Sequence, residues 1–320
     1  MSQPPSPASE PIFSVVVPVY GNEATLPEVI ERLTRLPGFG AGQLEAVFVV
    51  DASPDNSLAL LRRLLPGSGL AAQVLTHSRN FGSFAAIRSG MAAARGRYIG
   101  VMAADLQEPP ELMSEFHAAL SSGEVDVVVG RREARADPAM ASLAARSFWA
   151  AYRIAVNPEL PPGGVDVFAC TAAVAQTLAG LRESHTSLVG LLYWVGYRRV
   201  EVGYRRQERT SGKSGWTLRK RWQYLMDSVF AFTDLPVRLL TAVGGLGTVV
   251  TVVVGMVVFV AWLTGGITEP GYTPLMLVIV CSTFLLLTGL GIVGAYVWRA
   301  YENSKLRPSA IVASRERFGE

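Results

Sequence analysis

Apolar runs alternate with amphipathic segments through the first two thirds of the chain. Runs that are apolar on both faces predict buried strands, and these are Phe13–Val19, Leu44–Val50, Gln73–Thr76, Tyr98–Met102 and Val125–Val129. Apolar residues at helical spacing predict helices between them, after Thr25 and over Leu58–Leu65 and Ser83–Ala94, with a further helix that starts at Pro109 and Pro110. Strands that alternate with helices predict an α/β fold with a mostly parallel sheet.

The pattern becomes weaker after Arg131. Ala139–Val156 has helical spacing, and Arg199–Tyr204 alternates like a strand. Near the amino terminus, Thr25 and Glu28 have the spacing of a capping box, in which the threonine hydroxyl would cap the first helix.

Two long stretches near the carboxyl end, Leu239–Thr268 and Pro270–Trp298, contain no charged side chain. Each exceeds the roughly 20 residues that cross the hydrocarbon of a bilayer, and they predict two transmembrane helices. Two buried helices of a soluble core are the alternative. Lys and Arg flank both stretches and are absent from the connector around Glu269, which predicts that both termini and the catalytic domain are cytoplasmic, at the inner (plasma) membrane.

Trp216–Phe232 is amphipathic, with basic residues and tryptophans that suit a membrane interface. The alternative is that this helix packs on the catalytic domain. The predicted organisation is a disordered leader over residues 1–11, a catalytic domain over 12–208, a basic loop and interface helix over 209–236, two membrane helices over 237–298 and a cytoplasmic tail over 299–320.

Composition agrees with this organisation. Of 320 residues, 50% are hydrophobic and 17% are charged, and the net charge of +3 is explained by basic residues near the membrane, so no nucleic-acid partner is predicted. Cys170 and Cys281 have no disulfide or metal spacing, which indicates a reducing compartment.

Acidic residues at strand ends are the main candidates for chemistry. The loops after parallel strands gather at one sheet edge, which should bring together Tyr20, Glu23, Asp51, Arg79 and Asp105. Asp51 could accept a hydrogen bond from a nucleobase or ribose, and Asp105 and Gln107 could share a divalent cation. Helix capping is the alternative for Asp51, Asp55, Ser57 and Asp105.

Basic residues crowd a later loop that contains glycine and serine. Arg205, Arg206, Arg209 and Lys213 could meet phosphate there, and a solvated basic face is the alternative. No Gly-x-Gly-x-x-Gly follows the first strand, which argues against a dinucleotide-dependent oxidoreductase. His77, His117 and His185 have no metal spacing and accompany no nucleophile elbow, so neither a histidine metal site nor a hydrolase triad is predicted.

Five ordered motifs resemble those of the polyprenyl-phosphate glycosyltransferases of glycosyltransferase family 2, which have a GT-A fold and include enzymes similar to dolichol-phosphate mannose synthase. The motifs are Val17–Tyr20, Val49–Asp51, Arg79–Gly82, Ala104–Glu111 and Arg209–Trp216. The resemblance extends from Phe13 to about Arg299, because one branch of this family has two carboxyl-terminal membrane spans.

The resemblance implies transfer of a sugar from a nucleotide-sugar to a polyprenyl phosphate, with inversion at the anomeric carbon. We expect the nucleotide to be a uridine nucleotide. The resemblance also implies that the nucleotide-sugar is bound by Pro18, Tyr20, Glu23, Asp51, Arg79 and Asp105. Asp105 and Gln107 would bind Mg²⁺ or Mn²⁺, and Asp166, a second catalytic candidate, would lie near the acceptor. Donor or lipid phosphates would be met by Arg131, Arg206, Arg209, Lys213 and Ser214. Relatives of this branch also imply a homo-oligomer.

One departure from the family pattern concerns the metal. Ala103 stands where the family usually has the first acid of Asp-x-Asp, so a divalent cation would lose one charged ligand. A non-catalytic relative that binds nucleotide-sugar or lipid is therefore one alternative. A processive polysaccharide synthase is another, although Leu218 occupies the glutamine position of the Gln-x-x-Arg-Trp motif of that class.

Overall fold

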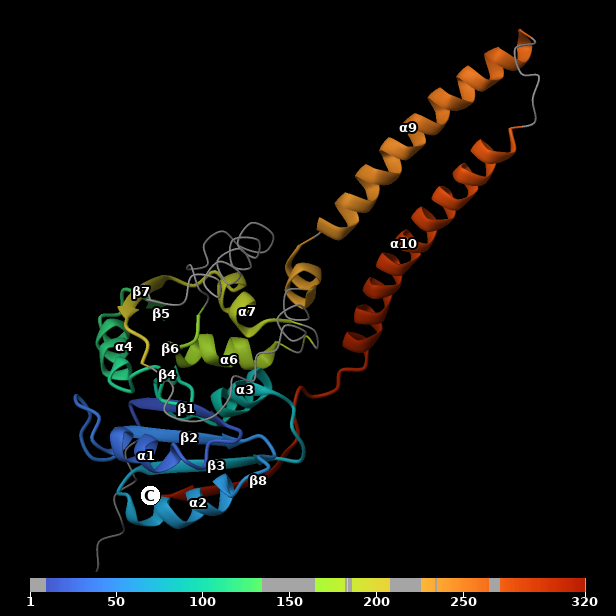
Figure 1. Cartoon of the computed structure of the whole chain (residues 1–320). Helices are drawn as coiled ribbons and strands as arrows, with labels where there is room; N and C mark the ends of the chain where they lie inside the picture. Colours follow the sequence, from blue (N-terminus) through green and yellow to red (C-terminus); the bar gives the residue numbers. More distant parts are fainter. Residues whose placement is uncertain are drawn as a thin grey trace, which may run out of the picture.

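The computed structural model describes residues 10–133, 165–181, 183, 186–207, 226–233, 235–264 and 271–319. Within them, one sheet has the strand order β7-β5-β6-β4-β1-β2-β3-β8 (Figure 1). The strands are β1 Phe13–Val19, β2 Leu44–Val50, β3 Ala71–His77, β4 Tyr98–Val101, β5 Val127–Arg132, β6 Phe168–Thr171, β7 Arg199–Tyr204 and β8 Val312–Phe318. Four neighbouring pairs are parallel and three, which involve β6 or β8, are antiparallel. The predicted α/β class with a mostly parallel sheet is confirmed.

Helices cover both faces of the sheet. The helices of the domain are α1 Leu26–Thr34, α2 Ser57–Leu64 with the 3-10 turn η1 Leu65–Gly67, α3 Ser83–Ala93, α4 Leu112–Ser121, α6 Ala172–Gly180 and α7 Leu188–Trp194. Because side chains alternate along a strand, Val15 and Val17 pack with α1, α2 and α4, whereas Val16 packs with α3, α6 and α7. These two apolar layers explain why the central strands read as continuous apolar runs.

Helix α3 lies unusually close to the sheet at one glycine. A Cβ on Gly90 would lie 2.3 Å from Val16 Cγ1, so only glycine allows this approach.

The amino end of α1 differs from the capping box that the sequence predicts. Thr25 makes no side-chain cap; its hydroxyl donates to the carbonyl oxygen of Ala104 at 2.6 Å and to that of Asn22 at 3.2 Å. Glu28 pairs with Arg32 one turn later. The reason is tertiary: the threonine satisfies a carbonyl group in the loop after β4 and so joins two loops.

The prediction that residues 299–320 form a tail is wrong, because part of this segment is a strand of the sheet. Helix α10 continues to Ser304, and β8 then pairs antiparallel with β3. Arg315 donates to Gln73 Oε1 at 2.8 Å, and Arg62 pairs with Glu316 at 2.6 Å. The three successive charged residues of β8, Arg315 to Arg317, fit an edge strand, because charged side chains protect an exposed edge from pairing with another chain.

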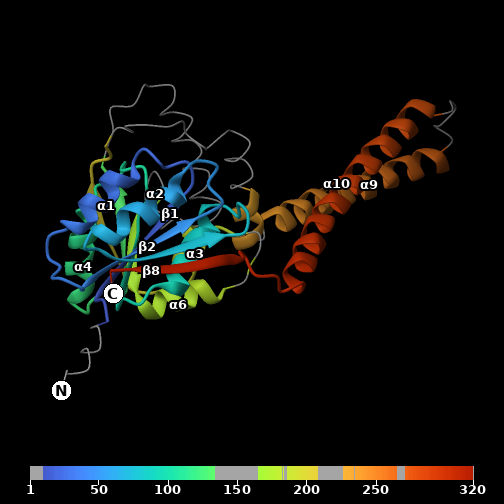
Figure 2. The same cartoon turned by 90° about the horizontal axis from the view of Figure 1, so that it is seen from below.

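Two long helices, α9 Leu235–Leu263 and α10 Tyr272–Ser304, lie side by side and extend away from the sheet (Figures 1 and 2). They approach closely at Gly289, where a Cβ would lie 3.4 Å from Leu240 Cδ1. Searched over the described residues, no individual helix has both the length and the apolarity to cross a membrane; Met226–Phe232 and Leu235–Gly247 would reach them only as a pair, with an 81° bend between them. The two predicted spans stay a prediction.

The described end of the amphipathic helix, residues 226–232, packs on protein at both sides. Asp227 Oδ1 accepts from Arg299 of α10 at 2.8 Å, and the ring of Phe230 lies 5.3 Å from that of Tyr296. Phe232 lies against Gly190 of α7, where a Cβ would come within 2.4 Å of its ring. This end of the helix therefore packs on the domain, as the alternative to a membrane interface predicts, and it connects α10 to that domain.

A buried carboxylate, that of Glu45 in β2, connects β1, β3 and the segment that follows α3. Glu45 has no exposed surface, and it accepts hydrogen bonds from Ser14 Oγ (2.7 Å), Gln73 Nε2 (2.7 Å) and Arg95 Nε (2.8 Å). A buried charge is tolerated because these partners replace its hydration.

We predict that Arg95→Met lowers the free energy of unfolding by about 3 kcal/mol, because it leaves Glu45 buried without its charged partner. Arg62→Met is the matched control; it breaks the exposed pair with Glu316, which solvent screens, and should cost much less than Arg95→Met. Urea unfolding of the purified chains measures both values. Equal losses would show that burial of Glu45 contributes nothing special.

Candidate active site

The direction of the strands brings the predicted site residues to one edge of the sheet. β1, β2, β3 and β4 are mutually parallel, and β5 and β7 share their direction because β6 runs antiparallel to both β4 and β5. The loops after all six strands therefore meet at one edge, where β6 and β8 begin. The predicted grouping of Tyr20, Glu23, Asp51, Arg79 and Asp105 at one edge is confirmed.

Hydrogen bonds tie the loops after β1 and β2 together. Gly21 N donates to Ser53 Oγ at 2.7 Å, Glu23 N donates to Asp55 Oδ2 at 2.9 Å, and Asn56 N donates to Glu23 Oε2 at 3.0 Å. Asp55 also accepts from Ser57 N, the first residue of α2, at 3.1 Å, but the N-cap position is Asn56 and no side chain among the described residues caps this helix. Both carboxylate oxygens of Glu23 accept from Asn56, one from its backbone N–H and one from its side-chain amide, whereas Tyr20 is 52% exposed.

Asp51 is 3% exposed and uses both carboxylate oxygens. Oδ1 accepts from Phe81 N at 2.9 Å and bonds His77 Nδ1 at 2.7 Å, and Oδ2 accepts from Gly82 N at 2.7 Å. These contacts fix the loop that precedes α3. The predicted contact of Asp51 with a nucleotide stays a prediction; its observed partners lie within the protein.

Two strand-end loops contain left-handed residues other than glycine. Ala52 has φ 50° directly after Asp51, and Leu106 has φ 58° between Asp105 and Gln107. Such backbone costs about 1–3 kcal/mol and concentrates at functional sites. At Leu106 it folds the chain back, so that Gln107 N donates to Asp105 Oδ1 at 3.2 Å.

Acids and arginines from four elements meet after β4; we call Asp105, Glu108, Arg132, Asp166, Tyr204 and Arg206 the acid–arginine cluster. Arg132 pairs with Asp166, and Tyr204 Oη donates to Asp166 Oδ2 at 3.3 Å. Arg206 Nη2 donates to Gln107 Oε1 at 2.5 Å, and its Nε lies 3.4 Å from Glu108 Oε1. The register explains the meeting, since Arg132 and Tyr204 are paired residues of β5 and β7.

Glu108 is the most perturbed acid of this cluster. It is 1% exposed, and burial, then the charges of Asp166 and Asp105, raise its pKa to about 7, against the smaller opposing effect of Arg206 and Arg132. Burial, followed by Asp166, also raises the pKa of Tyr204, which keeps its hydroxyl a donor at neutral pH. Strongly perturbed groups at a strand-end edge are typical of functional sites.

Several buried polar atoms in the cluster receive no hydrogen bond from any of the residues that the structure describes. They are Glu108 Oε1, Arg132 Nε and Arg206 Nε. Buried polar atoms are nearly always satisfied, so these three indicate a place where a polar ligand or water completes the bonding.

The structure brings together Asp105, Gln107, Asp166 and Arg206 of the predicted residues. Arg131 does not join the cluster; it lies on the other face of β5 and pairs with Glu201 at 3.1 Å, whereas Arg132 enters the cluster. The predicted contact of Arg131 with a phosphate stays a prediction. Four residues described above were not among the predicted site residues: Glu108, Arg132, Tyr204 and His77. Arg209, Lys213 and Ser214 lie outside the described residues.

The side chains present do not fit a metal ion held by the chain alone. Ala103 supplies no oxygen, and the Gln107 amide oxygen already accepts from a guanidinium group. Among the residues described, no three His, Cys, Asp or Glu side chains are grouped to hold a metal ion. The chemistry of this site is therefore derived from the side chains of the described residues, without Mg²⁺ or Mn²⁺.

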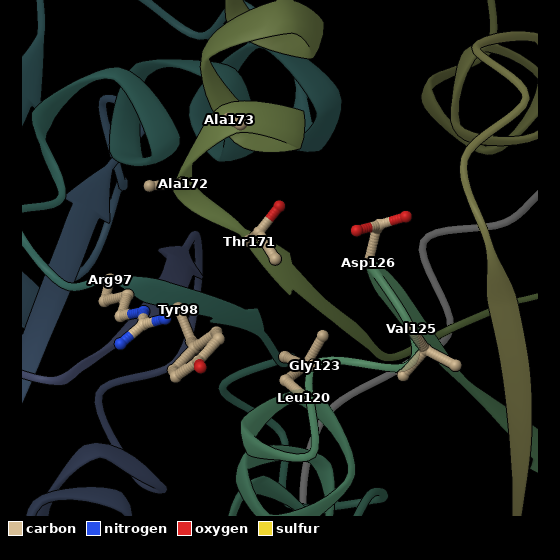
Figure 3. A pocket seen from close by; sticks show the side chains of 9 residues that line it. All are labelled: Arg97, Tyr98, Leu120, Gly123, Val125, Asp126, Thr171, Ala172 and Ala173. Atoms are coloured by element: carbon tan, nitrogen blue, oxygen red, sulfur yellow. The ribbon is translucent and has the colours of Figure 1, made fainter.

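A cavity of about 240 Å³ lies at the opposite edge of the sheet, where β4 begins and β6 ends (Figure 3). It is lined by Arg97, Tyr98, Leu120, Gly123, Val125, Asp126, Thr171, Ala172 and Ala173. Asp126 is engaged through both oxygens by Arg198, at 2.9 and 3.0 Å, which together with the other hydrogen bonds from that arginine lowers its pKa. Because Arg198 binds both oxygens of Asp126, this acid stabilises the wall of the cavity. The acid–arginine cluster is the better candidate for the active site.

Comparison with known proteins gives a family match. The glycosyl transferase family 2 model matches residues 14–173, which include Asp51, Asp105 and Asp166. The glycosyltransferase YkcC of Bacillus subtilis is 30% identical over 302 residues, 94% of this chain and 93% of that protein. The bactoprenol glucosyl transferase of Shigella phage SfV is 26% identical, over 95% of this chain and 99% of that protein. A solved glucosyl-3-phosphoglycerate synthase from Mycobacterium tuberculosis, in complex with Mn²⁺ and UDP-glucose, is 21% identical over 64% of this chain and 73% of that one, with a TM-score of 0.48.

Glu108→Gln tests the electrostatics of the cluster. Its folded pKa of about 7 exceeds its usual 4.5, so its contribution to stability is full below pH 4.5 and is lost as pH rises through 7. Between pH 5 and 8 without added metal, wild type should therefore lose more unfolding free energy than the variant, by up to roughly 3 kcal/mol. Glu111→Gln, at an exposed pair with Arg32, is the control. Identical pH slopes for wild type and Glu108→Gln would contradict the prediction.

Proposed function

We propose that this chain, which belongs to glycosyl transferase family 2, transfers a sugar from a nucleotide-sugar to the phosphate of a membrane polyprenol, with inversion at the anomeric carbon. The observation that carries the proposal is the acid–arginine cluster at the carboxyl ends of parallel strands, in which a buried acid, Glu108, and part-buried arginines have polar atoms left without a hydrogen bond from the described residues. Relatives that match nearly the whole chain are named bactoprenol glucosyl transferase, which supports a polyprenyl phosphate as acceptor.

The chemistry asks for charge stabilisation and alignment. A lipid phosphate is already anionic at neutral pH, so it needs little proton removal before it attacks the anomeric carbon. The departing nucleoside diphosphate carries negative charge, which Arg132 and Arg206 stabilise from fixed positions. Asp105 accepts hydrogen bonds from hydroxyl groups of the donor, and Asp166, held by Arg132 and Tyr204, orients the acceptor.

The donor is proposed to be a uridine nucleotide-sugar. Tyr20, exposed beside the loop after β2, is available to stack on a base. Arg79 is exposed at the same edge and is available to a diphosphate.

We further propose that α9 and α10 anchor this active site at the inner face of a plasma membrane. Both helices expose large apolar side chains, among them Leu246, Val257, Leu286 and Leu290, and such a surface is rare on a soluble monomer. The chain leaves the sheet at the end of β7 and re-enters at the start of β8, and both points lie at the edge that holds the cluster. A lipid phosphate at the membrane surface would then be close to the arginines. A homo-oligomer stays a prediction.

Ala103 favours one rival, a relative that binds nucleotide-sugar or lipid without turnover. Both ideas share the site and differ in whether a product forms.

An assay with a donor panel separates them. Membranes that contain the chain, washed with alkaline carbonate to remove peripheral proteins, are incubated with polyprenyl phosphate and labelled UDP-, GDP- and dTDP-sugars, with and without Mn²⁺. One charged glycolipid should form, with a UDP-sugar, in washed membranes and not in the wash. A polymer would indicate a processive synthase, and binding of a donor without turnover would support the non-catalytic rival.

We predict that Asp105→Asn lowers kcat/KM by roughly 10²-fold or more and leaves the fold intact, because a part-exposed acid at a strand end supports chemistry more than packing. Asp126→Asn is the matched control; this acid lies at the opposite edge and should keep wild-type activity. Initial rates and unfolding midpoints of both variants are compared. Activity of Asp105→Asn near that of the control would remove Asp105 from the site.

A further inference from the structure

A hydrogen-bonded series of side chains runs beneath the active-site edge. Ser89 Oγ in α3 lies 2.9 Å from His77 Nε2, and His77 Nδ1 lies 2.7 Å from Asp51 Oδ1. Asp51 then accepts from Phe81 N and Gly82 N at the start of α3. The His77 side chain has no exposed surface, so its partners are fixed by the packing around it.

The same order of groups, Ser-His-Asp, serves nucleophilic catalysis in hydrolases, where the histidine must reach the leaving group of a substrate. His77 has no exposed ring surface, and Ser89 sits within α3, one residue before Gly90, where the helix is pressed against Val16. The series therefore holds other parts of the protein in place and does not attack a substrate.

What the series holds is the loop over residues 78–82. Asp51 accepts two of its backbone N–H groups, and the ring of His77 packs edge-on to Phe81, with centroids 5.6 Å apart. Phe81 in turn lies under the guanidinium group of Arg79, 4.2 Å from ring centroid to Cζ. The position of an exposed arginine is thus linked through contacts to a buried histidine.

We propose that His77 is a positioning residue for donor binding: it holds the Asp51 carboxylate in the orientation that shapes loop 78–82 and presents Arg79 to the diphosphate of a nucleotide-sugar. This inference rests on the proposed function.

The physical reason is the cost of a buried charge. Asp51 is nearly inaccessible to water, and of the three donors that the described residues supply to it, the one from His77 belongs to a side chain. Without that donor, the carboxylate can turn away from Phe81 N and Gly82 N. The loop then loses two hydrogen bonds and leaves Arg79 less ordered. The free energy needed to order Arg79 must then come from binding of the nucleotide-sugar, so its affinity falls. The acid–arginine cluster is held by other residues, so the chemical step should change less.

Two substitutions separate the hydrogen bond from the space that the ring fills. His77→Leu removes the donor and should raise KM for the nucleotide-sugar about tenfold, the effect of one lost hydrogen bond to a charge, with kcat changed by less than about threefold. His77→Asn places an amide N–H near the position of Nδ1 and should restore KM to within about threefold of wild type.

Gln73→Leu is the matched control. Gln73 lies on the same strand and the same face as His77, and its amide bonds Glu45 and Ala93 O at the far end of α3. This change removes a comparable buried hydrogen bond without touching loop 78–82, so it should lower stability and leave KM unchanged.

The measurement is steady-state transfer at varied donor concentration, with donor affinity by calorimetry and unfolding midpoints for each variant. A raised KM in His77→Leu, its recovery in His77→Asn and an unchanged KM in Gln73→Leu support the inference. Wild-type KM in His77→Leu, or equal rises in His77→Leu and Gln73→Leu, would overturn it. Donor binding without transfer by wild type would refute the proposed function alone, since calorimetry still compares the variants.

Discussion

Three buried carboxylates determine how the loops of this protein are arranged. An ionised acid out of water is costly unless donors surround it, so each one draws in groups from separate elements. Glu45 gathers β1, β3 and the segment after α3, and Asp51 gathers β3 and the start of α3. Glu108, with Asp166 and Asp105 nearby, is placed beside an arginine from the end of β7. The same electrostatic requirement, met fully at Glu45 and Asp51 and only in part at Glu108, joins the strands to the loops around them.

The three acids differ in how completely they are satisfied, and this difference separates structure from function. Glu45 and Asp51 each accept three or more hydrogen bonds. Within the described part of the chain, Glu108 Oε1 and Arg206 Nε have no hydrogen-bond partner, although they lie 3.4 Å apart as an ion pair. A protein that satisfies two buried acids fully has the means to satisfy the third, so the incomplete bonding at Glu108 is best understood as a place kept for ligand groups.

The sequence predicted the frame of this arrangement and missed its connections. β1, β2 and β7 have the bounds that their apolar patterns indicate, and strand direction alone correctly placed Asp51 and Asp105 at one edge. The choice between Arg131 and Arg132 depends on which face of the sheet each side chain of β5 points to, and two neighbouring arginines give no pattern that decides it. His77 was set aside because it lacks metal spacing, yet its partners are Asp51, directly after β2, and Ser89 in α3, contacts that only the folded chain makes. β8 was placed in a tail, and its three successive charged residues, Arg315 to Arg317, give no apolar strand pattern; its pairing with β3 is made only in the fold.

β8 also bears on how the active site faces its acceptor. β7 and β8 are the two edge strands of the sheet, and the helical hairpin of α9 and α10 lies between them in the chain. A hairpin joined to one edge could rotate about a single connection. Joined to both edges, some seven strand spacings or roughly 34 Å apart, it has two separated connections, and the pairing of β8 with β3 and the bond between Asp227 and Arg299 add to them. Ile311 O accepts from Ser78 N at 3.0 Å, which brings the entry of β8 next to the loop that carries Arg79. The same strand that closes the sheet therefore sets the donor-binding loop beside the path to the hairpin, and under the proposed function this fixes the distance between donor and lipid.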